Sequence, residues 1–284
     1  MKEYPLLKSL ELIKKALSVK GMQLPENIDF RIINSEGFNI EVKLKSGHYQ
    51  CLIHRDALEI TYATCMFVSL YYSRNTVQEF PRVFKGNDLH CFISIIQRYA
   101  LKKSAEKPES YYENLNKCEE YDVDRIYLSV FTFIIAHEIS HILLGHLNGS
   151  SEHLIRFIKN DNDERYSQEF EADKLATEIL LIIDQLNSYS GRLSCGGINF
   201  FLIFQIICVA QSSAYSKILE DDGNELSSHP SPQKRIVTIR QLIESELGSG
   251  SIDCQAIKFD CRKFFIFLYD LEKYLNLKEH FSAV

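Results

Sequence analysis

The sequence has no excess of positive charge and no cysteine pairs of the kind that bind metals or form disulfide frameworks. Its 32 lysine and arginine residues stand against 38 aspartate and glutamate residues, so the net charge is -6. Nucleic-acid binding is therefore disfavoured, because it depends on a basic surface. The eight cysteines contain no Cys-x-x-Cys pair, and a chain of 284 residues does not need disulfides to fold. We expect reduced thiols in a cytoplasmic protein.

Long apolar runs are also scarce. The first residues contain no apolar segment of the roughly 7–15 residues that an export signal needs. Two apolar runs, at residues 126–136 and 198–210, fall short of the roughly 18 residues expected of a membrane-spanning helix. We interpret both as buried core helices, and peripheral membrane contact through 198–210 stays open. With 45% hydrophobic and 25% charged residues, the composition is that of a soluble globular protein of one or two domains.

Hydrophobic periodicity predicts a mostly helical α+β fold. Residues 28–33 and 38–44 alternate between apolar and polar, and the turn residues Asn-Ser-Glu-Gly separate them, which predicts a β-hairpin. Residues 48–72 are consistent with a strand followed by a helix, and the polar stretch 102–124 with a loop or linker. The helical period predicts helices over 6–17 and near 125–147, 163–187, 197–219, 232–247 and 258–276.

One apolar helix contains the pattern His137-Glu138-x-x-His141. Residues four apart on an α-helix lie about 40° apart around its axis and about 6 Å apart along it, so both imidazoles can face one ion. Glu138 lies about 60° beyond His141, where a carboxylate can deprotonate an attacking water. The alternative is a core helix in which both histidines form ordinary hydrogen bonds and bind no metal. Burying two histidines and a glutamate without partners is costly in free energy, however. The pattern is that of zinc peptidases, so we expect bound Zn2+.

A catalytic zinc ion needs a third protein ligand. The metzincin pattern is excluded, because Leu144 and Leu147 occupy the positions of its glycine and third histidine. On a continuous helix His146 falls about 140° from His141 and faces away from the metal. We therefore interpret His146 as a residue that supports the site from outside or lies at the surface.

The next acidic helix offers Glu169 and Asp173, which lie on one face because they are four residues apart. With Glu169 as the third ligand, Asp173 could accept the second ring N–H of a ligating histidine and fix its tautomer. Glu171 lies about 200° from Glu169. For Glu171 we favour a simple interaction with the helix dipole.

The segment Ser228-His229-Pro230-Ser-Pro leads into another helix. Its prolines shape the start of that helix and hold His229 just before it. A histidine fixed there could donate a hydrogen bond to the oxyanion of a tetrahedral intermediate. Arg235 could pair with an acid of the metal-site helix. On its own, the segment is also consistent with a helix start that contains an incidental histidine.

The order of these motifs resembles that of gluzincin-type metallopeptidases and, more narrowly, the Lit family of bacterial phage-exclusion peptidases. The resemblance implies zinc on His137, His141 and Glu169, with Glu138 as the base, and it strengthens the case for His229. Ser228 departs from the family, where threonine is expected. The matching segments are Gly37-Phe-Asn-Ile, Ala136-His-Glu-Ile-Ser-His-Ile-Leu-Leu-Gly-His, Gln168-Glu-Phe-Glu-Ala-Asp-Lys-Leu-Ala-Thr, and His229-Pro230 with Arg235-Ile236.

The resemblance also implies a biological role. Lit-like proteins are cytosolic zinc proteases that stay latent until a phage-derived peptide bound to translation elongation factor Tu activates them. They then cleave that factor and stop protein synthesis, which is abortive infection. A host protein, elongation factor Tu in particular, is therefore the expected substrate. Residues 74–125 depart from the family in composition, so the activator and the substrate remain open.

Together these patterns predict a zincin-like metallopeptidase core with an N-terminal β-hairpin region. Residues 1–124 would form an α+β region that binds substrate or activator, and residues 125–284 a helical zinc-peptidase region, both within one compact unit. Three alternatives remain. The first is a regulatory protease that cuts a repressor, and the second is a zinc-containing binding protein without catalysis. The third, a membrane-linked housekeeping peptidase, would need spanning helices.

Overall fold

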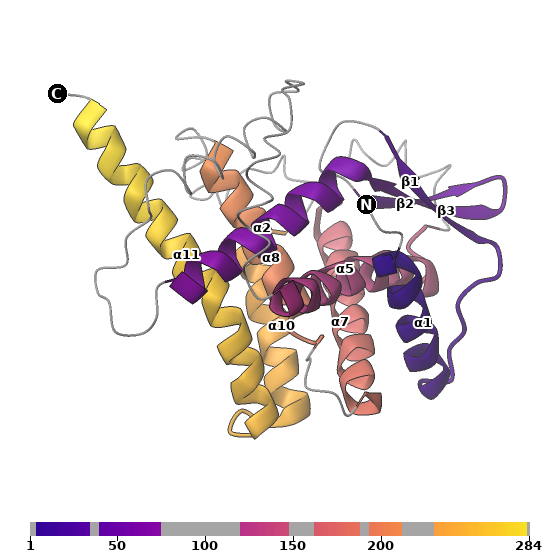
Figure 1. The fold of residues 1–284 in the computed structure, drawn as a ribbon. Helices are drawn as coiled ribbons and strands as arrows, with labels where there is room; N and C mark the ends of the chain where they lie inside the picture. Colours follow the sequence, from indigo (N-terminus) through magenta and orange to yellow (C-terminus); the bar gives the residue numbers. More distant parts are fainter. Residues whose placement is uncertain are drawn as a thin grey trace.

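The computed structural model describes residues 4–34, 40–74, 120–147, 162–187, 193–211 and 230–282. These residues form a mostly helical α+β fold with a small three-stranded sheet, which confirms the predicted fold class (Figure 1). The elements are α1 (Tyr4–Val19), β1 (Ile28–Ile33), β2 (Ile40–Lys45), β3 (His48–His54), α2 (Arg55–Arg74), α5 (Glu120–Leu143), α7 (Asn162–Leu186), α8 (Gly196–Gln211), α10 (Pro232–Leu247) and α11 (Ile252–Ser282).

The helix positions follow the predicted periodicity, with differences at the ends. α10 occupies the predicted range, and Ser231 caps it by accepting a hydrogen bond from the backbone N–H of Lys234. Pro232 stands at its first position, where a missing N–H costs nothing. α5 begins at Glu120 rather than near 125, so the last part of the predicted loop is helical. α11 is longer than predicted at both ends.

The strand pairing differs from the predicted hairpin. β1 does not pair with β2: the sheet order is β1-β3-β2, with β1 parallel and β2 antiparallel to β3. The hairpin in fact joins β2 to β3 through Ser46 and Gly47, whose φ angles are 51° and 76°. Two successive positive φ angles in a two-residue loop are those of a type I′ turn, whose twist matches paired strands. This short turn determines the pairing, and the predicted hairpin between 28–33 and 38–44 is wrong.

α5 is the helix around which the described residues are arranged. It packs against α1, α2, α7, α8 and β2, and Figure 1 shows it crossing the middle of the molecule, with α1 and the sheet toward one end and α8, α10 and α11 toward the other. The largest fully buried side chains are Phe131, Phe133, Phe264, Phe267, Ile13, Leu17, Ile53, Ile126 and Ile135. This core contains residues from both sides of position 124, and the proposed division there stays a prediction.

The apolar part of α5 is longer than the sequence run suggested. Val123–Leu143 spans 21 residues and is long and apolar enough to cross a membrane, and 72% of its most apolar window is buried within the protein. The expectation that no run reaches spanning length is therefore wrong. The interpretation as a core helix agrees with this burial, and a single such helix is weak evidence for a membrane span.

α8 approaches α5 unusually closely through two glycines. A Cβ atom on Gly196 would collide with the backbone carbonyl of Ser129, and one on Gly197 would lie 2.6 Å from a ring carbon of Phe133. Real Cβ contacts of this kind do not occur, so glycine is required at these positions. The close approach fixes α5 against α8 about one to two helical turns before His137.

The described cysteines are buried and free of disulfides: Cys51, Cys65, Cys195, Cys208, Cys254 and Cys261. Burial raises the pKa of Cys195 to about 12 and raises the pKa of Cys51 well above its ordinary value. These thiols therefore act as small apolar side chains of the core.

Candidate metal centre

The last turns of α5 bring the two predicted histidines onto one face. The Nε2 atoms of His137 and His141 lie 3.1 Å apart, and their rings are nearly perpendicular. His137 is buried among the core residues of α5 and contacts the ring of Phe133. The apolar stretch that precedes the motif thus positions the histidines at the end of a well-packed helix.

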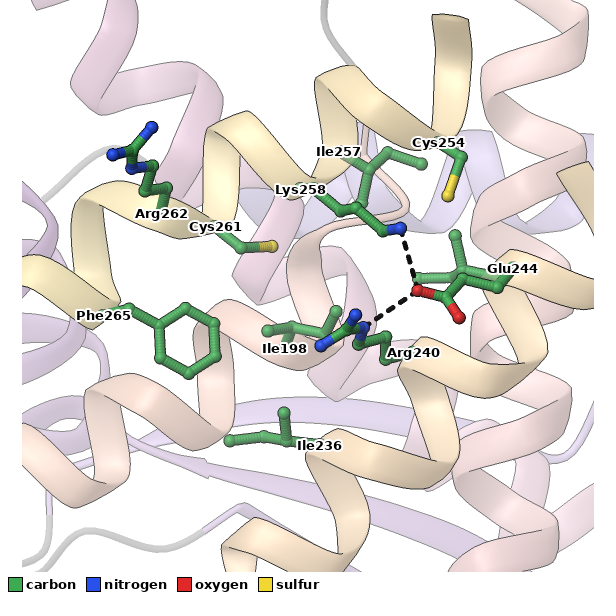
Figure 2. Close-up of a pocket in the computed structure, with 11 residues that line it drawn as sticks. Ile198, Ile236, Arg240, Glu244, Cys254, Ile257, Lys258, Cys261, Arg262 and Phe265 are labelled. Carbon is green, nitrogen blue, oxygen red and sulfur yellow. Dashed lines mark hydrogen bonds and ion pairs between the residues drawn. The ribbon is translucent and has the colours of Figure 1, made fainter. Parts of the chain in front are cut away.

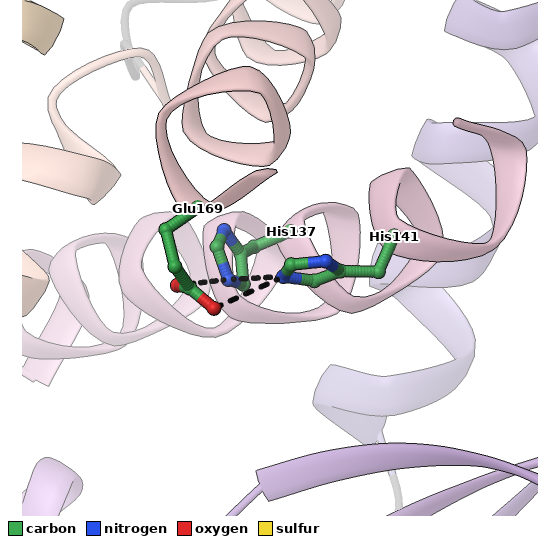
Figure 3. Close-up of side chains that lie close together, drawn as sticks. All are labelled: His137, His141 and Glu169. Atoms are coloured by element: carbon green, nitrogen blue, oxygen red, sulfur yellow. Dashed lines mark hydrogen bonds and ion pairs between the residues drawn. The ribbon is translucent and has the colours of Figure 1, made fainter. Parts of the chain in front are cut away.

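Glu169 on α7 lies beside the two histidines, as Figure 3 shows. Its carboxylate oxygens lie 3.5 Å from Nε2 of His137 and 3.6 Å from Nε2 of His141. All three donor atoms fall within 4.8 Å of one another. Donors around a tetrahedral zinc ion, each about 2.0–2.1 Å from it, lie about 3.3–3.4 Å apart. The three residues therefore fit a tetrahedral metal ion in both spacing and donor chemistry.

Asp173 and Arg235 contact the candidate ligands on the side away from the metal position. Oδ1 of Asp173 lies 3.0 Å from Nδ1 of His137, close enough for an ion pair, although the angle falls short of a directed hydrogen bond. Arg235 donates two hydrogen bonds of 2.7 Å to the Asp173 carboxylate. Its third nitrogen lies 3.1 Å from Glu169, and its guanidinium stacks on the Phe201 ring at 4.3 Å. α10 and α7 are thus joined directly behind the candidate ligands.

The carboxylates of the cluster favour positive charge between them. Burial opposes a charged His137, but Asp173 and Glu169 outweigh burial and raise the pKa of His137 to about 9. Burial, followed by the charge of His137, lowers the pKa of His141 to about 3. The acids therefore favour one positive charge at this point. A metal ion bound there would displace the extra proton of His137, because both imidazoles bind a metal in their neutral form.

Glu138 is half-buried where α5 packs against β2. Burial raises the pKa of Glu138 to about 7, although His137 and a backbone hydrogen bond from Val42 oppose the shift. A carboxylate with a pKa near neutrality is well suited to exchange protons with a reacting water. Its position next to the first histidine makes Glu138 the candidate base of the site.

His146 does not face away from the site, because α5 is not continuous to that residue. The helix ends at Leu143, and the backbone N–H of His146 bonds to the carbonyl of His141 at 3.0 Å. The N–H of Gly145 bonds to the carbonyl of Ile142 at 3.1 Å, and the φ angle of Gly145 is 75°. These two bonds with a left-handed glycine define a Schellman motif, which turns the chain back over the helix end. The predicted orientation of His146 is therefore wrong.

The turn brings His146 against His141 and a further acid of α7. Nδ1 of His146 lies 2.9 Å from Nδ1 of His141, and Nε2 of His146 lies 3.2 Å from Oε2 of Glu171. Glu171 also accepts a hydrogen bond from Ser167. The contact with His141 agrees with the interpretation of His146 as a residue that supports the site from outside. Glu171 was expected to interact only with the helix dipole, but it lies well inside α7 and beside His146. A glycine four residues after His141 is the sequence signal of this helix end.

His229 lies outside the described residues. The structure places Pro230, the next residue, in a buried position just before α10. The arrangement of α10 thus follows the prediction up to that point, and a role for His229 stays a prediction.

A separate hollow lies between α8, α10 and α11 (Figure 2). Its volume is about 250 Å³, and its floor is formed by apolar side chains of the three helices. On its rim Glu244 pairs with Arg240 and Lys258, each at 2.9 Å. No residue of the metal cluster lines this hollow, and the groups that do line it include no histidine. Among the described residues, the group that could hold a metal ion therefore lies at the end of α5 and not in this hollow.

Comparison with protein families agrees with this placement. The sequence profile of the peptidase U49 family matches residues 78–252, which is more than half of the chain. The chain belongs to the peptidase U49 family. The matched range contains every residue of the candidate metal centre, from His137 to Arg235. Membership in U49 indicates a hydrolase that acts on peptide bonds. Comparison with curated proteins and with solved structures gave no significant match.

Proposed function

We propose that this U49 protein is a zinc-dependent endopeptidase with its centre at His137, His141 and Glu169. One observation carries the proposal: three donors of the types that zinc prefers lie 3.1–3.6 Å apart within the range matched by a peptidase family. Two histidines and one carboxylate leave a fourth position for water or substrate. That open position distinguishes a catalytic site from a closed structural one.

The protein's own residues have distinct tasks in this mechanism. When bound, zinc would polarise the scissile carbonyl and lower the pKa of the attacking water. Glu138 takes the proton from that water and passes it to the leaving amine. Asp173 orients His137, and Arg235 keeps the Asp173 carboxylate ionised. Burial alone would raise the pKa of Asp173, but the charge and hydrogen bonds of Arg235 lower it.

His229 completes the proposed mechanism as a donor to the oxyanion. The support comes from its place in the sequence, one residue before the buried Pro230 and close to α10. Because Arg235 on α10 reaches the metal cluster, the start of the same helix is near the site. A neutral or charged imidazole can donate to the oxygen that gains negative charge in the transition state.

The biological part of the proposal follows from the motif order that resembles Lit-like peptidases. By that resemblance the protein acts in the cytoplasm in phage exclusion, and its substrate is a host protein, translation elongation factor Tu. A phage-derived peptide would release it from a latent state. Residues 1–124 would then contribute to binding of substrate or activator.

The alternatives are separated by specific observations. A repressor-cutting protease would share the same site and differ only in its substrate. A non-catalytic zinc protein would need a closed sphere of four ligands, and the cluster found among the described residues has three. A membrane-linked peptidase would require the apolar helix α5 to leave the core, where most of its apolar window is buried.

The decisive experiment compares the wild type with Glu138→Gln and with Glu246→Gln, an exposed acid on α10. Zinc content is measured on each purified protein, and new protein termini are sought after expression in bacterial cells with and without phage infection. We expect zinc in all three and cleavage of one host protein by the wild type and Glu246→Gln only. Zinc without cleavage under every condition would instead support the binding protein. Retained cleavage in Glu138→Gln would overturn the mechanism.

A further inference from the structure

The two histidines of the centre are held by different partners on the side away from the metal donors. His137 faces Asp173 directly, whereas His141 faces a second histidine, His146, at 2.9 Å. That histidine is 7% exposed, and its far nitrogen faces Glu171 at 3.2 Å. The three side chains form a row from the candidate metal position to the protein surface.

Proton positions along this row can be assigned from donor and acceptor chemistry. A histidine that binds a metal through Nε2 carries its proton on Nδ1. In His141 this Nδ1–H points at Nδ1 of His146, which must then accept and carry its own proton on Nε2. The Nε2–H of His146 in turn donates to the Glu171 carboxylate. Every contact then has one donor and one acceptor.

The opposite arrangement is incompatible with metal binding. If His146 carried its proton on Nδ1, it would donate to Nδ1 of His141, and a neutral His141 would then carry its proton on Nε2. That proton would occupy the lone pair needed for the metal. A carboxylate beside Nε2 of His146 disfavours this arrangement, because a carboxylate accepts hydrogen bonds and does not donate them when ionised.

We propose that His146 is a positioning residue that selects the metal-binding tautomer of His141, with Glu171 selecting the tautomer of His146. The inference rests on the proposed metal-binding function and deepens it. α7 then supplies three acids with separate tasks: Glu169 binds the metal, Asp173 orients one ligand, and Glu171 orients the other through His146. Outer partners of metal-ligating histidines typically contribute about 10–100-fold to metal affinity.

The test measures zinc affinity by competition with a chelator, with zinc alone and no peptide substrate. His146→Leu removes the acceptor, and we expect zinc to bind about 10–100-fold more weakly. His146→Gln keeps an acceptor in its amide oxygen and should retain most of the affinity. Glu171→Leu should have a smaller effect than His146→Leu, because Glu171 is 57% exposed and water can replace it.

His48→Leu is the matched control, since it removes an exposed histidine on β3. We expect wild-type affinity for it. A second readout is the Nδ1 proton of His141 in the nitrogen–proton spectrum of the zinc-loaded protein. The hydrogen bond to His146 should protect this proton from exchange with water in the wild type and in His146→Gln. It should exchange rapidly in His146→Leu.

The outcomes separate this inference from the proposed function. Tight zinc binding by the wild type and by His146→Leu, with an equally protected ring proton, would overturn the positioning role and leave the peptidase proposal intact. Weakened binding by His146→Leu with no rescue by His146→Gln would also overturn it, because loss of packing would then explain the effect. A wild type without zinc affinity would overturn the metal centre itself.

Discussion

Arg235 and Asp173 form a buried bidentate ion pair that joins α10 to α7. Both hydrogen bonds are 2.7 Å long, Asp173 is fully buried, and Arg235 is 6% exposed. A buried charge depends on its partner, because water cannot replace the lost interaction. The pair therefore contributes to the stability of the fold as well as to the geometry of the site.

The first prediction concerns this pair. Arg235→Leu leaves Asp173 buried without its main partner and should lower the free energy of unfolding by about 3–5 kcal/mol. Replacing both residues, as Arg235→Met with Asp173→Leu, should recover much of this loss, because no unpaired charge remains. Urea unfolding followed by circular dichroism measures the free energy of unfolding of the single and the double variant. Arg240→Leu is the control, and its exposed ion pair should matter little. Equal effects of Arg235→Leu and Arg240→Leu would contradict the prediction.

The second prediction concerns the third ligand. Glu169→Ala removes one of three donors, so zinc should be retained poorly after dialysis, whereas Glu246→Ala should keep it. Metal content is measured by mass spectrometry of the purified proteins. Full zinc occupancy in Glu169→Ala would mean that another residue completes the site.

The third prediction tests the contact between α8 and α5. Gly196→Ala introduces a methyl group that collides with the Ser129 carbonyl, and we expect a loss of about 1–3 kcal/mol from overpacking. Gly250→Ala is the control, because no atom lies within 4 Å of the position that its Cβ would occupy. Thermal unfolding of both variants measures the difference. Similar midpoints would show that the helices can separate without cost.

The fourth prediction concerns the buried thiols. Burial raises the pKa of Cys51, Cys65 and Cys195, so their thiolate fraction at about pH 8 is far below that of a free cysteine. Iodoacetamide should leave these three cysteines unmodified in the native protein and label them in urea, as peptide mass spectrometry can determine. Rapid labelling of Cys195 without denaturant would show that the core opens locally.

Two pairings within the candidate metal centre could be predicted from the sequence, because helical spacing determines which side chains of one helix share a face. His137 and His141 are four residues apart, as are Glu169 and Asp173, and each pair lies on one helix. Their meeting between α5 and α7 depended on motif order and could not be calculated from spacing. Arg235 was predicted to pair with an acid of the metal-site helix, and the structure brings it to Asp173.

The predictions that failed depended on local backbone conformation. His146 was assigned to the wrong side because the helix was assumed to continue past Gly145, where a positive φ angle ends it. The hairpin was assigned to the wrong strands because Asn-Ser-Glu-Gly is a stronger turn signal by composition than Ser46-Gly47. In both cases a glycine in a left-handed conformation determined the path of the chain.

The three acids of α7 constrain the number of residues between Glu169 and Asp173. Glu169 and Asp173 lie on the helix face that contacts His137, and Glu171, between them, lies on the face that contacts His146. A single residue inserted between Glu169 and Asp173 would rotate everything beyond it by about 100°. Such an insertion would separate Asp173 from both His137 and Arg235 at once. Among U49 proteins we therefore expect insertions and deletions to be excluded from this segment.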